Sequence, residues 1–195
     1  KPDGDAMGSS LALYHFLIQL GHDVTVVSPT NWAPFLDWMP GIDTVIDFEK
    51  KKEVALKLIS DADYLFCLDF NTLSRTKNME QPLADAKGAR ILIDHHQQPQ
   101  TEVFAFGVSD TTKSSTCEMV YDLIMESSHG AHISLDVATC LYTGLMTDTG
   151  SFRFPATTAS VHRMIAHLKD LGLDHTAVHS HIFDNSFRLI YELQK

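Results

Sequence analysis

Three ionisable residues stand side by side where a predicted buried strand ends. The apolar run "RILI" leads directly into Asp94, His95 and His96. Because taking three ionisable groups out of water together costs free energy unless they have partners, the triplet indicates a chemical role. Imidazole and carboxylate groups bind divalent cations and transfer protons, so either chemistry would suit it.

Four aspartates at the ends of other predicted elements extend this pattern. Two precede a helix, one follows the apolar run "YLFCL" and one ends an apolar helix: Asp3, Asp5, Asp69 and Asp148. Ligands of parallel α/β sheets bind beyond the carboxyl ends of the strands, so these side chains are expected at one rim. At ~5 Å and an effective dielectric constant near 20, each pair of carboxylates would repel by about 3 kcal/mol.

Two divalent cations would turn that repulsion into attraction. A mixed set of carboxylates and imidazoles suits Mn²⁺ best, or Mg²⁺, with Co²⁺ and Zn²⁺ as further alternatives. Two such ions about 3.5–4 Å apart can share a bridging hydroxide and hold a phosphoryl group for in-line displacement. The residues therefore predict a two-metal phosphoryl site.

The elements that must position these residues follow from hydrophobic patterning. Strands are predicted at 23–29, 45–48, 63–70, 89–94 and 103–111, and helices at 9–20, 50–60, 115–125, 134–146, 157–171 and 174–195. Continuous apolar strands separated by helices are typical of a parallel sheet covered on both faces. We expect a doubly wound, mainly parallel α/β fold with a helical C-terminal part. Since nothing marks an internal boundary, residues 1–195 are predicted to form one domain.

Composition excludes several other classes. The formal net charge of −10 argues against binding of long duplex DNA or anionic lipid, which depends on clustered Lys and Arg. The three cysteines, Cys67, Cys117 and Cys140, have no CxxC spacing and lie in apolar segments, which predicts buried thiols in a reducing compartment. No apolar run approaches the length of a membrane span, so a cytoplasmic protein is expected.

Four segments together resemble the DHH phosphoesterase superfamily. They are "PDGDAMGS", "CLDFN", "LIDHHQ" and "MTDTGSFRF", which occur in this order and cover most of the chain. Within that superfamily, the first and last are most similar to the small cytoplasmic nanoRNase/pAp phosphatases, the bifunctional oligoribonucleases. This resemblance implies hydrolysis of short RNA or DNA oligonucleotides and of 3′-phosphoadenosine 5′-phosphate.

The resemblance also implies a role for each matching residue. Asp3 would bind the first metal and Asp5 the second, Asp69 would bridge both, and His95 and Asp148 would complete the second site. Asp94 would orient the histidines, and His96 would face the substrate, where it stabilises phosphoryl charge or protonates the leaving oxygen. Three further residues are candidates for substrate binding: Gly8, which would let the backbone approach, Ser9 at the start of the helix, and Arg153.

Two departures from the family pattern affect the expected activity. The first motif of the family normally has a histidine four residues before its first aspartate, a position ahead of Lys1. The family also has a C-terminal nucleotide-binding domain, and residues 185–195 resemble the connection to it. We therefore expect a chain trimmed at both ends.

Other functions stay open at this level. Within the superfamily, the alternatives are hydrolysis of inorganic pyrophosphate and cleavage of cyclic dinucleotides. Outside enzymology, the chain could be a non-catalytic module that binds nucleotide or metal, although all the aspartates of the four motifs are present. The substrate in the cell, the polarity of cleavage and the oligomeric state, with a homodimer as one alternative, are not specified.

Overall fold

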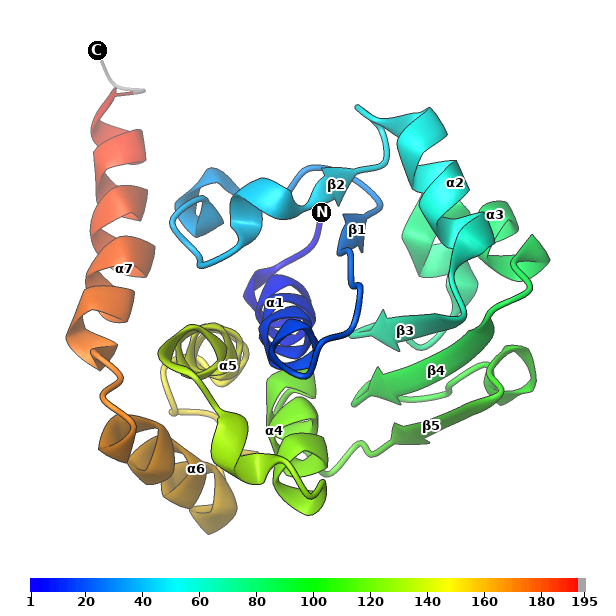
Figure 1. The fold of residues 1–195 in the computed structure, drawn as a ribbon. Coiled ribbons are helices and arrows are strands. Elements are labelled where there is room, and N and C mark those ends of the chain that lie inside the picture. Colours follow the sequence, from blue (N-terminus) through cyan, green and yellow to red (C-terminus); the bar gives the residue numbers. More distant parts are fainter. Residues whose placement is uncertain (193–195) are drawn as a thin grey trace.

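The strands form two parallel sheets in the computed structural model, which describes the backbone of residues 1–192 and the side chains of residues 1–184. In the first sheet, β1 (Val27–Ser28) pairs with β2 (Ile46–Asp47). In the second, β4 (Ala89–Asp94) lies between β3 (Tyr64–Leu68) and β5 (Phe106–Ser109). Figure 1 shows the three larger strands with their carboxyl ends pointing toward α1.

Helices make up most of the remaining described chain. The α-helices are α1 (Gly4–Gln19), α2 (Lys52–Asp61), α3 (Glu80–Asp85), α4 (Thr116–Glu126), α5 (Leu135–Asp148), α6 (Ala159–Asp170) and α7 (His175–Glu192). The 3-10 helices are η1 (Pro34–Leu36), η2 (Ile42–Thr44), η3 (Leu73–Met79), η4 (Thr101–Val103) and η5 (Gly130–His132). No helix in the described part is long and apolar enough to cross a membrane.

Helices cover both faces of the larger sheet. Leu68 and Ile93, which are partners in the parallel register, belong to the main core that α1, α4 and α5 build. The neighbouring Leu65 points to the other face and packs with a second core, in which Ile59 of α2 and Leu83 of α3 are buried. Successive residues of a strand alternate between faces, so this division is that of a doubly wound sheet. The predicted fold class is confirmed.

Glycines allow α1 and α5 to pack closely. A Cβ atom on Gly4 would lie 2.3 Å from the side chain of Thr147, and one on Gly8 would lie 2.7 Å from the backbone oxygen of Cys140. On α5, a Cβ atom on Gly144 would lie 3.0 Å from the Cα of Asp5. Because these glycines have no Cβ atom, the start of α1 can pack directly against the backbone of α5.

Two predicted boundaries are wrong. The first helix begins at Gly4 instead of residue 9, because the Asp3 carboxylate accepts hydrogen bonds from the N–H groups of Asp5 and Ala6 and caps an earlier start. The strand predicted over residues 23–29 contains only Val27 and Ser28, which pair with the equally short β2. The strand predicted at 89–94 has the same bounds in the structure, the other predicted strands and helices are present with shifted ends, and α7 confirms the last helix up to residue 192.

The three cysteines are buried and free, as the sequence predicts. Burial raises the pKa of the Cys67 thiol to about 12 and the pKa of the Cys117 and Cys140 thiols as well. Thiols with raised pKa values are unreactive, so these residues act as small apolar side chains.

Candidate metal centre

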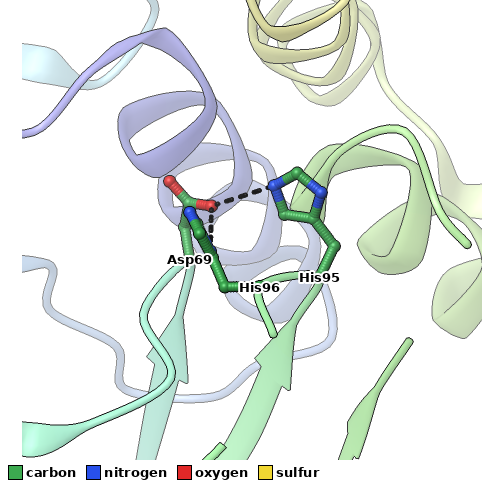
Figure 2. A group of neighbouring side chains, drawn as sticks. All are labelled: Asp69, His95 and His96. Carbon is green, nitrogen blue, oxygen red and sulfur yellow. Dashed lines mark ion pairs between the residues drawn. The ribbon is translucent and has the colours of Figure 1, made fainter. Parts of the chain in front are cut away.

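The predicted ligands meet at the carboxyl ends of β3 and β4. Asp69 directly follows β3, and His95 directly follows β4. Asp5 comes from the first turn of α1 and Asp148 from the last residue of α5, so both helices point one end at this rim. Figure 2 shows one carboxylate oxygen of Asp69 paired with the rings of both His95 and His96.

His95 lies at the centre of the acidic residues. Its Nε2 atom is 3.8 Å from Asp5 Oδ2, 3.7 Å from Asp69 Oδ1 and 3.5 Å from Asp148 Oδ2. These separations are longer than an ordinary hydrogen bond. Ligand atoms that share one ion at bond lengths of about 2.1 Å lie roughly 3–4 Å apart, so the spacing matches a shared cation.

The ligand atoms form two overlapping groups. Asp5, His95 and Asp148 each offer an atom within 4.8 Å of the others, and so do Asp69, His95 and His96. Both groups contain hard oxygen and imidazole nitrogen donors, the set that suits Mn²⁺, Mg²⁺ or Co²⁺. Within the described residues, the geometry thus fits divalent ions at this rim.

The N-terminus of α4 holds Asp5 in place. The backbone N–H of Thr116 donates to Asp5 Oδ2 at 2.6 Å, and the N–H of Cys117 donates to Asp5 Oδ1 at 2.9 Å. Asp5 is 1% exposed, so these two amides are its main compensation for the loss of water. Each of its oxygens keeps a lone pair for a further interaction.

Asp69 is held in an unusual backbone conformation. Its φ is 63°, in the left-handed region, which non-glycine residues rarely adopt. The hydroxyl of Thr116 donates to Asp69 Oδ1 at 3.0 Å, and the N–H of Asp69 donates to the carbonyl oxygen of Ile93. Such conformations are concentrated at functional sites, where the surrounding structure fixes them.

Burial raises the pKa of three carboxylates at this rim, and neighbouring charges raise two of them further. Burial, and then the charges of Asp5 and Asp3, raise the pKa of Asp69 well above its usual range. Burial likewise raises the pKa of Asp5, against the effect of its amide partners. Burial and the charge of Asp5 raise the pKa of Asp148 to about 6. The ionised forms of these carboxylates are therefore poorly compensated by positive charge. A bound divalent ion would provide that charge.

The tautomer of His95 follows from its second ring nitrogen. Nδ1 of His95 lies 3.4 Å from the carbonyl oxygen of Lys113, which can only accept a hydrogen bond. Protonated Nδ1 leaves a lone pair on Nε2, the atom that faces the three carboxylates. The loop that carries Lys113 is fixed by buried Glu118, whose Oε2 accepts from the N–H and the hydroxyl of Ser114 at 2.8 Å.

Asp94 contacts His96 and is fully buried. Its Oδ1 is 2.7 Å from His96 Nδ1, and its Oδ2 accepts from the backbone N–H of His96 at 3.1 Å. This contact fixes the orientation of the His96 ring, the supporting position expected for Asp94. His96 Nδ1 is also 3.8 Å from Asp69 Oδ1, and His96 is a member of the ligand group that contains Asp69 and His95.

The other predicted site residues lie elsewhere. Asp3 is outside both ligand groups, although its charge reaches Asp69 and Asp148. Gly8 packs against α5. Ser9 is in the second turn of α1 instead of at its start, and it is fully buried, with its hydroxyl donating to the carbonyl oxygen of Asp5 at 2.7 Å. Arg153 is exposed and donates to the carbonyl oxygen of Gly150 at 2.7 Å.

Sequence reasoning missed the contribution of α4. Ser115 and Glu118 signal a helix start, and the Ser115 hydroxyl does accept the N–H of Glu118 at 3.0 Å. Nothing in that local motif indicates that the next residue, Thr116, contacts Asp5 and Asp69. The only sequence feature that could have indicated these contacts is a small polar residue, Thr116, at the start of an apolar helix. Such residues are common at helix starts, so the feature is not specific.

Comparisons with known proteins place this geometry in context. The model of the DHH family, N-terminal domain, matches residues 1–145. The "Bifunctional oligoribonuclease and PAP phosphatase NrnA" of Thermus thermophilus is 36% identical over 177 residues, which are 88% of this chain and 48% of that protein. A "Probable manganese-dependent inorganic pyrophosphatase" of Streptococcus equi is 27% identical over 64% of this chain and 47% of its own length.

A solved structure is also similar. The crystal structure of an exopolyphosphatase-related protein from Bacteroides fragilis superposes with a TM-score of 0.92 and is 39% identical, over 94% of this chain and 54% of that one. The chain thus spans about half the length of the relatives that it matches.

Proposed function

The chain belongs to the DHH family, and from this membership and the geometry of the rim we propose that it hydrolyses phosphate esters of short nucleic acids with two divalent metal ions. Its substrates would be short RNA or DNA oligonucleotides and 3′-phosphoadenosine 5′-phosphate, because a relative 36% identical is named an oligoribonuclease and PAP phosphatase. Mn²⁺ is the proposed ion, with Mg²⁺ or Co²⁺ as substitutes.

One observation carries the proposal. His95 Nε2 lies within 3.8 Å of the oxygens of three aspartates from three separate elements, at separations that match ligands around a cation. Carboxylates packed this closely destabilise a protein unless a positive charge joins them. Two bound divalent ions supply a hydroxide nucleophile and neutralise the charge that develops on the phosphoryl oxygens.

The residues of the chain have distinct proposed roles. Asp5, His95 and Asp148 would hold one ion, Asp3 would contribute to the other, and Asp69 would contribute to both. His96 orients the phosphoryl group or protonates the leaving oxygen, since its ring lies in the same group as Asp69 and His95 while Asp94 already occupies its Nδ1 atom. Gly8 and Ser9 support this arrangement through the packing of α1, and Arg153 has no proposed contact with the substrate.

A second candidate is hydrolysis of inorganic pyrophosphate. It is favoured by the similarity to a protein named a manganese-dependent inorganic pyrophosphatase, over 64% of this chain. The same metal ligands could support both reactions. The two candidate functions therefore differ only in the substrate that is hydrolysed. Cleavage of cyclic dinucleotides has no comparable support here.

Turnover of four substrates tests the proposal. The full-length protein is assayed with Mn²⁺ against a dinucleotide, 3′-phosphoadenosine 5′-phosphate, pyrophosphate and a cyclic dinucleotide. We expect turnover of the first two, and its loss by a factor of about 10³ or more in His95→Ala, which removes the central donor. Turnover of pyrophosphate alone would support the second candidate, and turnover that survives in His95→Ala would contradict the site.

A further inference from the structure

A cleft of about 260 Å³ adjoins the candidate metal centre. It lies between the start of α1, the ends of β1 and β3, and η3, and both Asp3 and Asp69 line it. Its volume is close to the lower limit of small-molecule sites in proteins, about 300 Å³. A group bound in it would therefore be close to a phosphoryl group bound at the metals.

Basic residues of η3 line the cleft. Arg75 and Lys77 of η3 line it and are exposed. Within residues 1–184, neither side chain forms an ion pair, although the chain carries ten more negative than positive charges. The only carboxylates that line the cleft are Asp69, a member of one ligand group, and Asp3, whose charge helps to raise the pKa of Asp69. Arg75 and Lys77, together with Lys1, thus line a space that no other acidic residue lines.

The backbone of η3 presents these cations in a fixed geometry. Lys77 has φ 55° and ψ −114°, which breaks the helical geometry between the turns of η3. A non-glycine residue in such a conformation costs about 1–3 kcal/mol and persists only where neighbouring contacts fix it. Those contacts are present, because the Thr76 hydroxyl donates to the carbonyl oxygen of Leu73 at 2.6 Å and the Met79 side chain is buried in the second core.

The cleft also has an aromatic wall. Phe66 of β3 is 38% exposed and lines the cleft together with Phe70. Nucleobases stack on such rings whatever their sequence, and each stacked base contributes about 1–3 kcal/mol. Cations beside an aromatic surface suit a nucleotide better than they suit an isolated phosphate.

We propose that this cleft binds a second, non-reacting phosphate of a nucleotide substrate, with Arg75 and Lys77 as its ligands and Phe66 beside the attached base. The inference rests on the proposed function, in which the metal centre holds the reacting phosphoryl group. It adds a subsite to that function, which would favour substrates that carry a terminal phosphate in addition to the ester that is cleaved.

Binding of cleavage-resistant dinucleotides tests the inference. Three phosphorothioate-linked diadenosine dinucleotides are compared by fluorescence competition with Mn²⁺ present: one with a 5′-phosphate, one with a 3′-phosphate and one with neither. In the full-length protein, one of the two terminal phosphates should tighten binding about tenfold or more. In Arg75→Gln/Lys77→Gln that gain should disappear, while binding of the unphosphorylated dinucleotide should change less than about twofold.

Two further variants make the result specific. Arg163→Gln/Lys52→Gln removes two exposed cations that lie outside the cleft, and it should keep the full gain. Arg75→Lys/Lys77→Arg keeps both charges and should keep most of the gain. The inference is overturned if neither phosphate improves binding by the unmodified protein, or if Arg75→Gln/Lys77→Gln keeps the gain. Failure of the proposed function would appear separately, as absence of turnover of unmodified dinucleotides.

Discussion

The Thr116 hydroxyl donates to Asp69 Oδ1 at 3.0 Å, while the backbone N–H of the same threonine donates to Asp5 Oδ2 at 2.6 Å. One residue at the start of α4 therefore orients two carboxylates from different elements. A carboxylate oxygen that already accepts one hydrogen bond can bind a cation only along its remaining lone-pair directions. Thr116 therefore restricts where a metal ion can bind Asp5 and Asp69.

We expect Thr116→Val to weaken metal binding without unfolding the protein. Valine keeps the branched shape and the backbone N–H but removes the hydroxyl that orients Asp69. Loss of such a supporting hydrogen bond typically lowers metal affinity or activity about 10–100-fold. Calorimetric titration with Mn²⁺ measures the affinity, and Thr116→Ser, which retains the hydroxyl, is the matched control. Equal affinity in the valine variant and the original protein would contradict this role.

Asp69→Asn should stabilise the metal-free protein and abolish turnover. Its pKa is raised well above the usual range by burial and by Asp5 and Asp3, so its ionised form is less favourable in the folded protein than in the unfolded chain. Asparagine removes the charge, retains an acceptor for Thr116 and tolerates φ 63°. The midpoint of thermal unfolding in EDTA should rise by about 2–4 °C, the shift that about 1 kcal/mol causes in a chain of this size.

The same variant should lose the stabilisation that Mn²⁺ gives to the original protein. Asp69→Asn is therefore compared with and without Mn²⁺, and Asp85→Asn, an exposed residue of α3, serves as the control. A lower midpoint in EDTA for Asp69→Asn would show that the carboxylate is not held in an unfavourable ionised form.

Stability without metal should decrease as the pH rises from about 4 to about 6. The pKa of Asp148 is about 6 in the folded protein, against an ordinary value of 3.8. Because the folded state binds this proton more tightly, the contribution of Asp148 is fully present below about pH 4 and is lost by about pH 6. Thermal unfolding in EDTA from pH 4 to 7 should show a steeper decrease for the original protein than for Asp148→Asn. Parallel curves would refute the assignment.

Gly144→Ala should displace Asp5 and destabilise the fold. The added Cβ atom would lie 2.3 Å from the Cys117 sulfur and 3.0 Å from Asp5 Oδ1, so the start of α1 must shift. Overpacking of this kind costs about 1–3 kcal/mol. Chemical denaturation measures the loss, and Gly130→Ala is the control, because its Cβ atom would meet nothing closer than 3.3 Å. Equal stability of the two variants would exclude tight packing at Gly144.

His96→Gln and Asp94→Asn should separate catalysis from metal binding. If His96 acts on the substrate, His96→Gln lowers kcat and leaves Mn²⁺ affinity within a few-fold of the original. Asp94→Asn keeps the shape but weakens the 2.7 Å contact with His96 Nδ1, so it should lower kcat by a smaller factor and shift its pH profile. A large loss of Mn²⁺ affinity in His96→Gln would instead make His96 a metal ligand.

The convergence of the site was predictable because it depends on strand ends. Asp69 and His95 each directly follow one of two paired parallel strands, and the carboxyl ends of paired parallel strands lie at the same rim whatever connects them. The position of Asp148 was predictable because it ends an apolar helix two residues before Gly150. Once these segments are assigned, the fold leaves little choice about where their side chains meet.

The supporting contacts were not predictable, because they are long-range. Thr116 and Asp5 are 111 residues apart, and only the packing of α4 against α1 brings them together. The role of Asp3 as a helix cap was missed because the same carboxylate was interpreted as a metal ligand alone. The break at Lys77 has no local signal either, since no glycine or asparagine occupies that position.

Asp5 and Asp148 are 143 positions apart in the chain, counted as 148 − 5, yet both face His95 Nε2. An ion bound by both residues would cross-link the chain across most of its length. Like a disulfide, such a cross-link would oppose unfolding. Removal of that ion would loosen the junction of α1, β4 and α5 before it loosened the second core. Amide hydrogen exchange near the start of α1 and the ends of β4 and α5 should then be faster without the ion than with it.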